Sequence, residues 1–224
     1  MLLHVLAEGY SERKFAEEML AEWLAPKQLY VVARCVETHR DEKRGLRYSG
    51  GVTSYAKLRR DLTGWLKENS SKDARFTTML DYYALPGDFP GIGDADEKCD
   101  VFEKVACLEE AFRKDIGDYR LIPYIQLHEF EALLFVDPGQ LENIYLERSE
   151  EIGGLKEIAD QFGNPELIDN GPETAPSKRI LQKIPEYKKT TAGVETLKRI
   201  GIENLKAKCS HFAEWLGKLE GMDV

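Results

Sequence analysis

The chain has 224 residues, of which 42% are hydrophobic and 32% charged, a composition typical of a globular protein with one large core. Its net charge of −9 excludes binding to nucleic acid through overall charge alone, while a local basic surface is still compatible with it. No apolar run approaches the ~18 residues that span a bilayer, the start is not typical of a signal peptide, and the four cysteines form no metal-binding pair. We therefore expect a cytoplasmic protein with no membrane partner.

Strands and helices are predicted to alternate over the first part of the chain. Short apolar runs predict buried strands at residues 2–7, 29–37, 74–81 and 119–127. Helices with an apolar stripe separate them, the first capped by Ser11 and ended by Pro26. This order predicts parallel strands joined by right-handed crossovers. The fold class is therefore α/β, with a Rossmann-like core of about four parallel strands flanked by helices.

The pattern changes in two places. Residues 38–51 are polar, carry Arg40, Lys43, Arg44 and Arg47, and are expected to form a long mobile loop. After residue 136, short helical stretches replace the alternation. We therefore expect a core at 1–136 and, packed on it as part of a single structural unit, a helical extension at 137–224. One last helix is predicted through Leu205, Cys209, Phe212, Leu216 and Leu219.

Acidic residues follow three of the predicted strands. Glu8 follows the first, Asp81 ends the third, and Glu129 and Glu131 follow the fourth in "IQLHEFEALLF". Ligands bind beyond the carboxyl ends of strands in open parallel sheets. Clustered carboxylates repel one another unless a cation lies between them, and hard oxygen ligands suit Mg²⁺ or Mn²⁺. The sequence predicts a metal site there, with Glu12 as a further ligand one helical turn after Glu8.

A simpler explanation stays open for each acid. Glu8 and Glu12, and likewise Glu129 and Glu131, could favour a helix N-terminus for reasons of helix dipole, and Asp81 could cap a turn. His128 is a candidate proton shuttle or phosphate contact, with a structural role as the alternative. If Glu129 and Glu131 share a helical turn, their side chains point about 200° apart. If the strand continues through Glu131, both lie on one face.

Candidate phosphate contacts lie in two basic segments. Ser177, Lys178 and Arg179 follow Pro176 at a predicted helix start, where backbone amides, a hydroxyl and two cations would meet. The predicted loop supplies Arg44 as a further candidate. A solvated loop and an ordinary helix start are the alternatives. The chain contains no Walker loop, no G-x-G-x-x-G and no G-x-S-x-G, so P-loop and serine-hydrolase chemistry are not supported.

Four motifs, in order, resemble a known family. They are "AEGYSERKF" at 7–15, "TTMLDYYALPGDFPG" at 77–91, "PYIQLHEFEALLF" at 123–135 and "PETAPSKRI" at 172–180. Over nearly the whole chain they resemble the bacterial domain-of-unknown-function family 4276, a TOPRIM-like family related to OLD-type nucleases. The resemblance implies a compact core of four parallel strands with flanking helices.

The resemblance also implies roles for individual residues. Glu8 matches the TOPRIM glutamate after the first strand, and Glu12 the second glutamate of the Glu-Gly-x-x-Glu form of OLD-type nucleases. Asp81 matches the first aspartate of Asp-x-Asp, whose second position is Tyr83 here. Asp88 is a candidate to substitute in part. At the next strand end, the pair of acids after His128 resembles the acidic pair of OLD-type proteins.

Three functions remain open. The first is a Mg²⁺- or Mn²⁺-dependent nuclease with four catalytic acids, in which Asp81, Glu129 and Glu131 hold the metal and Glu8 is a general base or a further metal ligand. The second is a non-catalytic module that recognises nucleic acid or a partner and works with an ATPase, as the resemblance suggests for phage-defence or mobile-element loci. The third is a small-molecule phosphoryl-transfer enzyme using the same acids. The sequence leaves the substrate and the oligomeric state undetermined.

Overall fold

The computed structural model describes residues 1–41, 46–49, 52–168 and 174–222, and for 37–51 it describes only backbone strands. Contacts within the chain separate two compact units, residues 1–125 with 222–224, and residues 126–221. This division precedes the predicted boundary at residue 136. The predicted packing of the extension on the core stays a prediction.

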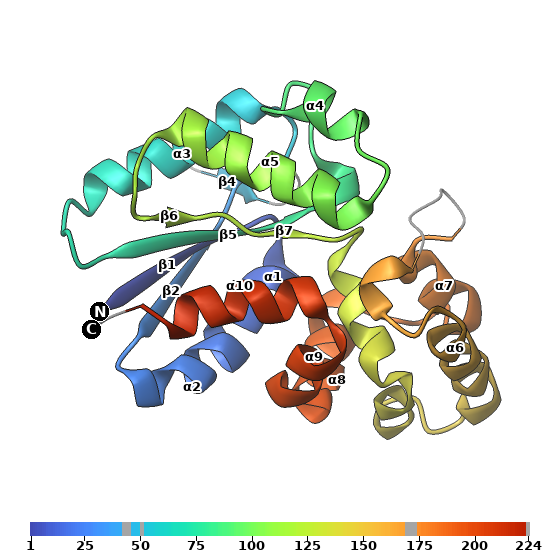
Figure 1. Cartoon of the computed structure of the whole chain (residues 1–224). Helices are drawn as coiled ribbons and strands as arrows, with labels where there is room; N and C mark the ends of the chain where they lie inside the picture. The colour runs from blue at the N-terminus through green and yellow to red at the C-terminus, as the bar shows by residue number, and fades with distance from the viewer. Residues whose placement is uncertain (42–45, 50–51, 169–173, 223–224) are drawn as a thin grey trace. The chain divides into compact units, whose positions relative to one another are not determined.

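The first unit is built on a parallel sheet with strand order β2-β1-β5-β6. These strands are β1 (Leu2–Ala7), β2 (Tyr30–Cys35), β5 (Arg75–Asp81) and β6 (Leu121–Ile122). A short strand at the end of the unit, β7 (Ile125–Gln126), also pairs with β5. The α/β prediction with about four parallel strands is confirmed (Figure 1).

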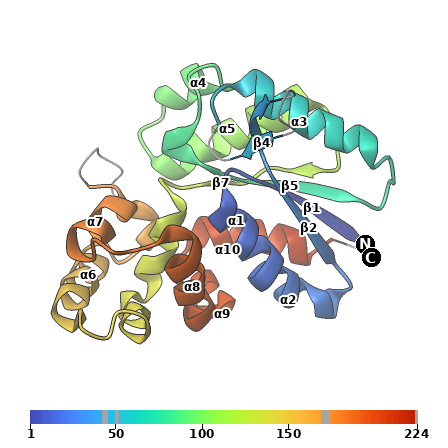
Figure 2. The ribbon, with the colours of Figure 1, turned by 180° about the vertical axis from the view of Figure 1, so that it is seen from behind.

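Helices cover both faces of this sheet (Figures 1 and 2). One face carries the continuous helical segment α1 (Tyr10–Phe15), η1 (Ala16–Leu20), α2 (Ala21–Leu24) and η2 (Ala25–Lys27). The other carries α3 (Tyr55–Glu68), α4 (Ile92–Asp96) and α5 (Val101–Ile116). Strand β1 is buried from Leu3 to Ala7 because it lies between two strands and two helical layers. A central parallel strand covered on both faces reads as a continuous apolar run.

The predicted helices of this unit form, with one different start. The helix expected between the second and third strands is α3, and its buried apolar stripe runs from Tyr55 to Leu66. The first helix begins two residues earlier than a cap at Ser11 would place it: Gly9 is the N-cap, and Ser11 lies within α1. Asp100 caps α5 by accepting hydrogen bonds from the amides of Phe102 at 2.8 Å and Glu103 at 3.1 Å.

The prediction of a long loop at 38–51 is wrong. Strands β3 (Glu37–Asp41) and β4 (Leu46–Ser49) pair antiparallel within this range. Polar and charged side chains do not prevent strand pairing, because the ladder is made by backbone groups. The predicted phosphate contact Arg44, together with Lys43, lies outside the described residues.

The second unit is helical around one buried segment, η4 (Phe130–Val136), in which every residue is buried. This segment contacts α6 (Ser149–Phe162), α7 (Pro176–Lys183), α8 (Val194–Ile200) and α9 (Ile202–Lys208). The remaining helices are η5 (Pro138–Asn143), η6 (Pro165–Leu167), η7 (Lys189–Gly193) and α10 (Ser210–Glu220). The predicted last helix is two helices, α9 and α10, divided at Cys209. Among the described residues, no helix has the length and apolarity to cross a membrane.

Candidate functional site

Glu8 and Asp81 meet at the carboxyl ends of two neighbouring strands of the first unit. Strands β1 and β5 are parallel, with Ala7 opposite Met79, so the residues that follow lie at the same sheet edge. The Glu8 amide donates to the Met79 carbonyl at 2.9 Å. Glu8 Oε2 accepts a hydrogen bond from the Asp81 amide at 2.9 Å. The topology therefore places two predicted site acids together, and Asp81 is buried there.

Glu12 lies beside the same turn. It is 3% exposed, in the first turn of α1. A Cβ atom on Gly9 would lie 3.0 Å from Glu12 Oε2. Glycine at the helix cap therefore leaves room for this carboxylate, which is why Glu-Gly followed by a glutamate suits the strand-to-helix turn. The favourable helix dipole that we considered as the simpler explanation also acts on Glu12.

The acid that Asp-x-Asp would require has no direct replacement here. Tyr83 is 48% exposed in η3 (Tyr82–Ala84), directly after β5. Asp88 Oδ1 accepts a hydrogen bond from the Tyr55 amide at 3.1 Å, at the start of α3. That carboxylate therefore helps to satisfy a helix N-terminus rather than standing in for the second aspartate.

The donor chemistry of the first unit fits a hard divalent cation. Glu8, Glu12 and Asp81 offer only carboxylate oxygens, the ligand type of Mg²⁺ and Mn²⁺. Across the described ranges, no three His, Cys, Asp or Glu side chains are grouped closely enough to hold a metal ion by themselves. Magnesium is usually bound by one or two carboxylates together with waters and substrate phosphates, so a complete protein cage is not required.

In the second unit, Glu129 binds Ser177 through two groups. The Ser177 amide donates to Glu129 Oε1, and the Ser177 hydroxyl donates to Oε2 at 3.1 Å. Glu129 is 1% exposed, and Ser177 lies in the first turn of α7. A buried carboxylate at a helix N-terminus is stabilised by the amide and by the helix dipole. Glu129 therefore anchors the start of the helix that carries the predicted phosphate contacts.

Neither predicted geometry of the two acids after the fourth strand occurs. Strand pairing ends at Gln126, and His128 adopts a left-handed backbone with φ 59°. Glu129 is then extended, with φ −147°, and Phe130 begins a 3-10 helix that contains Glu131. The left-handed region is uncommon outside glycine, but histidine is among the residues that enter it more often. His128 is buried at this turn, and its predicted role as proton shuttle stays a prediction.

Glu131 pairs with a lysine that the sequence did not single out. The Lys189 ammonium lies 3.0 Å from Glu131 Oε2 and 5.9 Å from the centroid of the Phe130 ring. The Glu131 side chain is 0% exposed, while that of Lys189 is 39% exposed. A buried carboxylate is costly without a cation beside it, so Lys189 compensates it. Its partly exposed ammonium is a candidate phosphate contact.

Tyr187 lies next to this pair. Its hydroxyl is buried and has no hydrogen-bond partner among the described residues. Burial raises the pKa of Tyr187 well above its ordinary value, and the negative charge of Glu131 raises it further. Gly193 makes room for the ring, because a Cβ atom there would lie 2.7 Å from the Tyr187 hydroxyl oxygen. In the sequence, only the cluster "EYKKTTAG" at 186–193 marks this region, and it has no periodic pattern.

The two predicted cations of α7 differ in how they are held. Lys178 is exposed at the start of the helix. Arg179 donates from Nε to the Thr174 carbonyl at 2.6 Å, and its guanidinium lies 5.6 Å from the centroid of the Phe162 ring. Lys178 is therefore the more available phosphate contact of the two.

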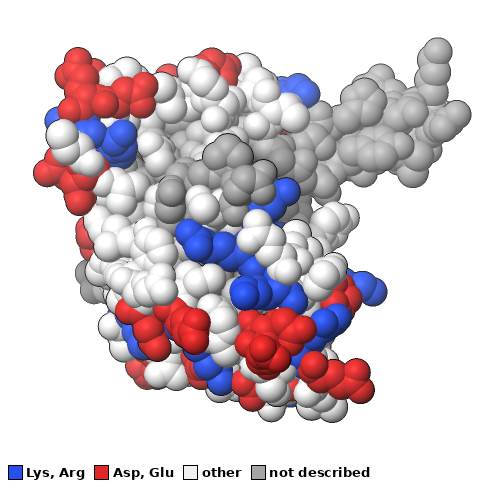
Figure 3. Space-filling view, turned by 90° about the vertical axis from the view of Figure 1, so that its right-hand side faces the viewer, with Lys and Arg blue, Asp and Glu red and all other residues white. Residues whose placement is uncertain are grey.

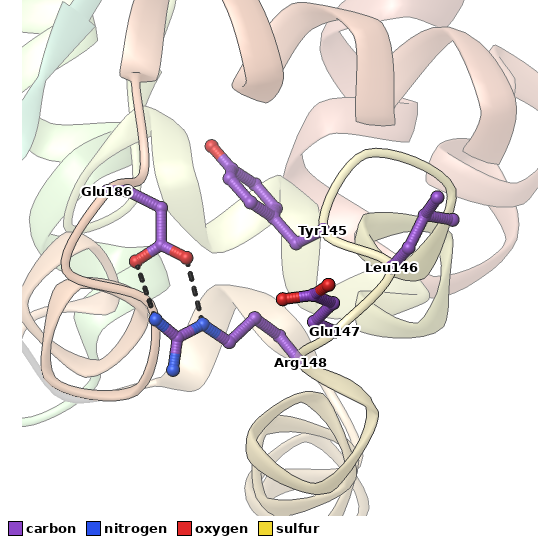
Figure 4. A pocket seen from close by; sticks show the side chains of 5 residues that line it. All are labelled: Tyr145, Leu146, Glu147, Arg148 and Glu186. Atoms are coloured by element: carbon purple, nitrogen blue, oxygen red, sulfur yellow. Dashed lines mark hydrogen bonds and ion pairs between the residues drawn. The ribbon is translucent and has the colours of Figure 1, made fainter.

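A hollow of about 350 Å³ on the second unit contains none of the predicted site residues (Figure 4). It is lined by Tyr145, Leu146, Glu147, Arg148 and Glu186. The Arg148 guanidinium binds Glu186 through Nε at 2.8 Å and Nη2 at 3.2 Å, and Glu151 through Nη1 at 2.9 Å. Its donors are thus engaged by carboxylates of the chain itself, so the hollow gives no reason to place the site there.

Comparisons with known proteins agree with the resemblance. Residues 7–220 match the family described as "Domain of unknown function (DUF4276)". Among solved structures, the chain is similar to the C-terminal region of the Burkholderia pseudomallei OLD protein, with 14% identity, 98% of each chain covered and a TM-score of 0.45. It is also similar to the C-terminal region of the Xanthomonas campestris pv. campestris OLD protein, with 12% identity, 98% of each chain covered and a TM-score of 0.37. The comparison with curated proteins finds no match.

Proposed function

Because the chain belongs to the DUF4276 family, whose description names no activity, we propose its function from its own side chains: a divalent-metal-dependent phosphodiester hydrolase acting on nucleic acid. The observation that carries the proposal is the hydrogen bond from the Asp81 amide to Glu8 Oε2, at 2.9 Å, with Glu12 buried at the same turn. Glu8, Glu12 and Asp81 thus lie at the carboxyl ends of β1 and β5, the edge at which open parallel sheets bind ligands.

Glu8 and Asp81 would hold Mg²⁺ or Mn²⁺, with Glu12 as a further oxygen ligand. A bound ion of this kind polarises a phosphoryl oxygen and lowers the pKa of bound water. The strand ends fix the backbone positions of Glu8 and Asp81 through the pairing of β1 with β5. The glycine at position 9 gives the Glu12 carboxylate its place.

Basic groups of the second unit would bind phosphate. Lys189 is held by buried Glu131, and Lys178 follows the helix start anchored by Glu129. We propose Glu129 and Glu131 mainly as residues that position Ser177 and Lys189. Their predicted role as metal ligands, and that of Ser177 and Arg179 in phosphate binding, stay predictions.

A non-catalytic recognition module working with an ATPase is the second candidate. Two observations favour it: Tyr83 stands at the second acid position, and the described residues contain no three-residue metal group. This candidate predicts binding of nucleic acid or a partner without metal-stimulated cleavage.

The test is cleavage of labelled single- and double-stranded DNA and RNA by the purified chain, with Mn²⁺, with Mg²⁺ and with EDTA. We expect metal-stimulated cleavage that falls at least about a hundredfold, or about 2.7 kcal/mol of transition-state stabilisation, in Glu8→Gln and in Asp81→Asn. Glu97→Gln is the matched control, because Glu97 is an exposed acid of the same unit. Cleavage that is unchanged in both site variants would overturn the proposal, and turnover of p-nitrophenyl phosphate alone would favour small-molecule chemistry.

A further inference from the structure

One segment of the second unit has a charge opposite to that of the chain. Residues 176–190, "PSKRILQKIPEYKKT", contain five Lys or Arg and one Glu, a net charge of +4 in a chain of −9. Lysines 178, 183 and 188 of this segment are exposed. In Figure 3, Lys and Arg side chains gather in the middle of the view, and most acidic side chains lie below them.

Arg179 and Lys183 lie against the neighbouring helix α6. The Arg179 guanidinium lies over the Phe162 ring and bonds the Thr174 carbonyl. The end of Lys183 lies across Gly154, where a Cβ atom would meet Nζ at 3.1 Å and Cε at 3.2 Å. Two side chains of the basic segment, Arg179 and Lys183, therefore lie against α6, while Lys178 and Lys188 are exposed.

Gly154 leaves room for the end of Lys183, although glycine is an unfavourable residue inside a helix. Glycine inside a helix is about 1 kcal/mol less favourable than alanine. Gly153, the preceding residue in α6, has nothing within 4 Å of its Cβ position, whereas Gly154 has Lys183. Replacing Gly154 by a larger residue would therefore displace Lys183, and replacing Gly153 would not.

We propose that the basic segment 176–190, which includes α7 and lies against α6, binds the phosphate backbone of a nucleic-acid strand through Lys178, Lys183 and Lys188. Lys183 follows Lys178 by five residues, a rise of about 7.5 Å along the helix and a turn of about 140° around it, so the two ammonium groups would meet different phosphates of a polymer. The choice of nucleic acid among polyanions rests on the proposed function. A membrane surface suits this segment less well, because Leu181 is the one large apolar residue exposed on α7 and a membrane-bound helix needs an apolar face.

The experiment measures binding of a fluorescent single-stranded DNA of about 16 nucleotides to the full chain, in EDTA, over a series of salt concentrations. The wild type should bind with a log–log salt slope to which each lysine contact contributes about 0.7. Lys178→Gln with Lys183→Gln should lower affinity about tenfold and reduce the slope by about 1.4. Lys67→Gln, which removes an exposed lysine of the first unit, should change neither.

A second pair of variants tests whether DNA binding depends on the position of Lys183 when its charge is kept. Gly154→Gln should weaken DNA binding severalfold by displacing Lys183, while Gly153→Gln should bind as the wild type does. Circular dichroism and the urea midpoint show whether both variants are folded. Equal effects of the two glycine variants, or an unchanged salt slope in the double lysine variant, would overturn the proposal.

The choice of partner has its own controls. Binding of the wild type to poly-glutamate or to phosphatidylserine vesicles as tightly as to DNA, at the same salt, would overturn the assignment to nucleic acid. Because the measurements contain EDTA, they do not depend on cleavage. Binding without metal-stimulated cleavage would reject the proposed hydrolase and support this inference. Metal-stimulated cleavage that is unchanged in the double lysine variant would support the hydrolase and reject this inference.

Discussion

The Lys189 ammonium lies 3.0 Å from Glu131 Oε2, and the two side chains differ sharply in exposure: 39% for the lysine and 0% for the glutamate. The buried partner depends on the exposed one, because a carboxylate without a cation is costly to bury while an exposed ammonium can be solvated by water. This asymmetry predicts that removing the lysine charge lowers the free energy of unfolding more than removing the glutamate charge does.

Lys189→Met should lower the free energy of unfolding by about 1–3 kcal/mol, because it leaves the Glu131 charge uncompensated. Glu131→Gln should cost less, and adding it to Lys189→Met should recover part of the loss. Urea unfolding of the four proteins gives the double-mutant cycle. Glu131→Gln costing as much as Lys189→Met, with no recovery in the double variant, would contradict the asymmetry.

Gly91 is required by backbone and space together. Its φ of +83° lies in the left-handed region, and a Cβ atom there would lie 2.6 Å from the Ala111 Cβ. Gly91→Ala should therefore destabilise the protein by about 2 kcal/mol, through strain and overpacking between α4 and α5. Gly93→Ala is the control, because nothing lies within 4 Å of its Cβ position. Urea midpoints that fall equally in both variants would count against this explanation.

Glu166 should make stability fall as pH rises. Burial raises the pKa of this carboxyl above 4.5, although the His211 and Phe212 amides, each 2.9 Å from it, act in the opposite direction. A folded-state pKa above the unfolded value gives stability that is present below the unfolded pKa and lost as pH rises through the folded pKa. The wild type should therefore lose stability relative to Glu166→Gln as pH rises above 4.5. Urea unfolding at several pH values measures this difference, and the opposite slope would refute it.

Asp115 should show the opposite sign. The hydrogen bond from the Tyr55 hydroxyl, at 2.5 Å, and then that from Arg59 lower the pKa of Asp115 below 3.8. A lowered folded-state pKa gives stability that is present above the unfolded value and lost as pH falls through the folded one. In Tyr55→Phe, an NMR titration should show the Asp115 pKa rising towards 3.8. Arg113→Gln, which removes the partner of Glu110, should leave the Asp115 pKa unchanged.

The sequence predicted well where one local pattern determines the structure. The apolar run at β1 has its predicted bounds, and the helix expected between the second and third strands forms as α3. Burial on both faces of a strand, or on one face of a helix, leaves a plain pattern in the sequence. The parallel order followed from the alternation of these elements. Glu8 and Asp81 could be placed together for the same reason, since parallel neighbouring strands end at one edge.

Other features depend on contacts that periodicity does not encode. Strands β3 and β4 pair through backbone groups, although the sequence of this region is polar. The fourth predicted strand is split between β6 and β7, around Pro123, which has no amide to donate to a ladder. Lys189 lies far from Glu131 in the sequence, so its role emerged only from the fold. A single sequence does not show which distant residue compensates a buried charge such as that of Glu131.

The most direct test of the central claim is a titration with Mn²⁺ followed by electron paramagnetic resonance, in which bound ions lose the signal of free aqueous Mn²⁺. The wild type and Glu97→Gln should bind Mn²⁺ in competition with Mg²⁺. The double variant with Glu8→Gln and Asp81→Asn should bind it at least about tenfold more weakly. Equal Mn²⁺ affinity in the double variant and the wild type would contradict a metal site at the ends of β1 and β5.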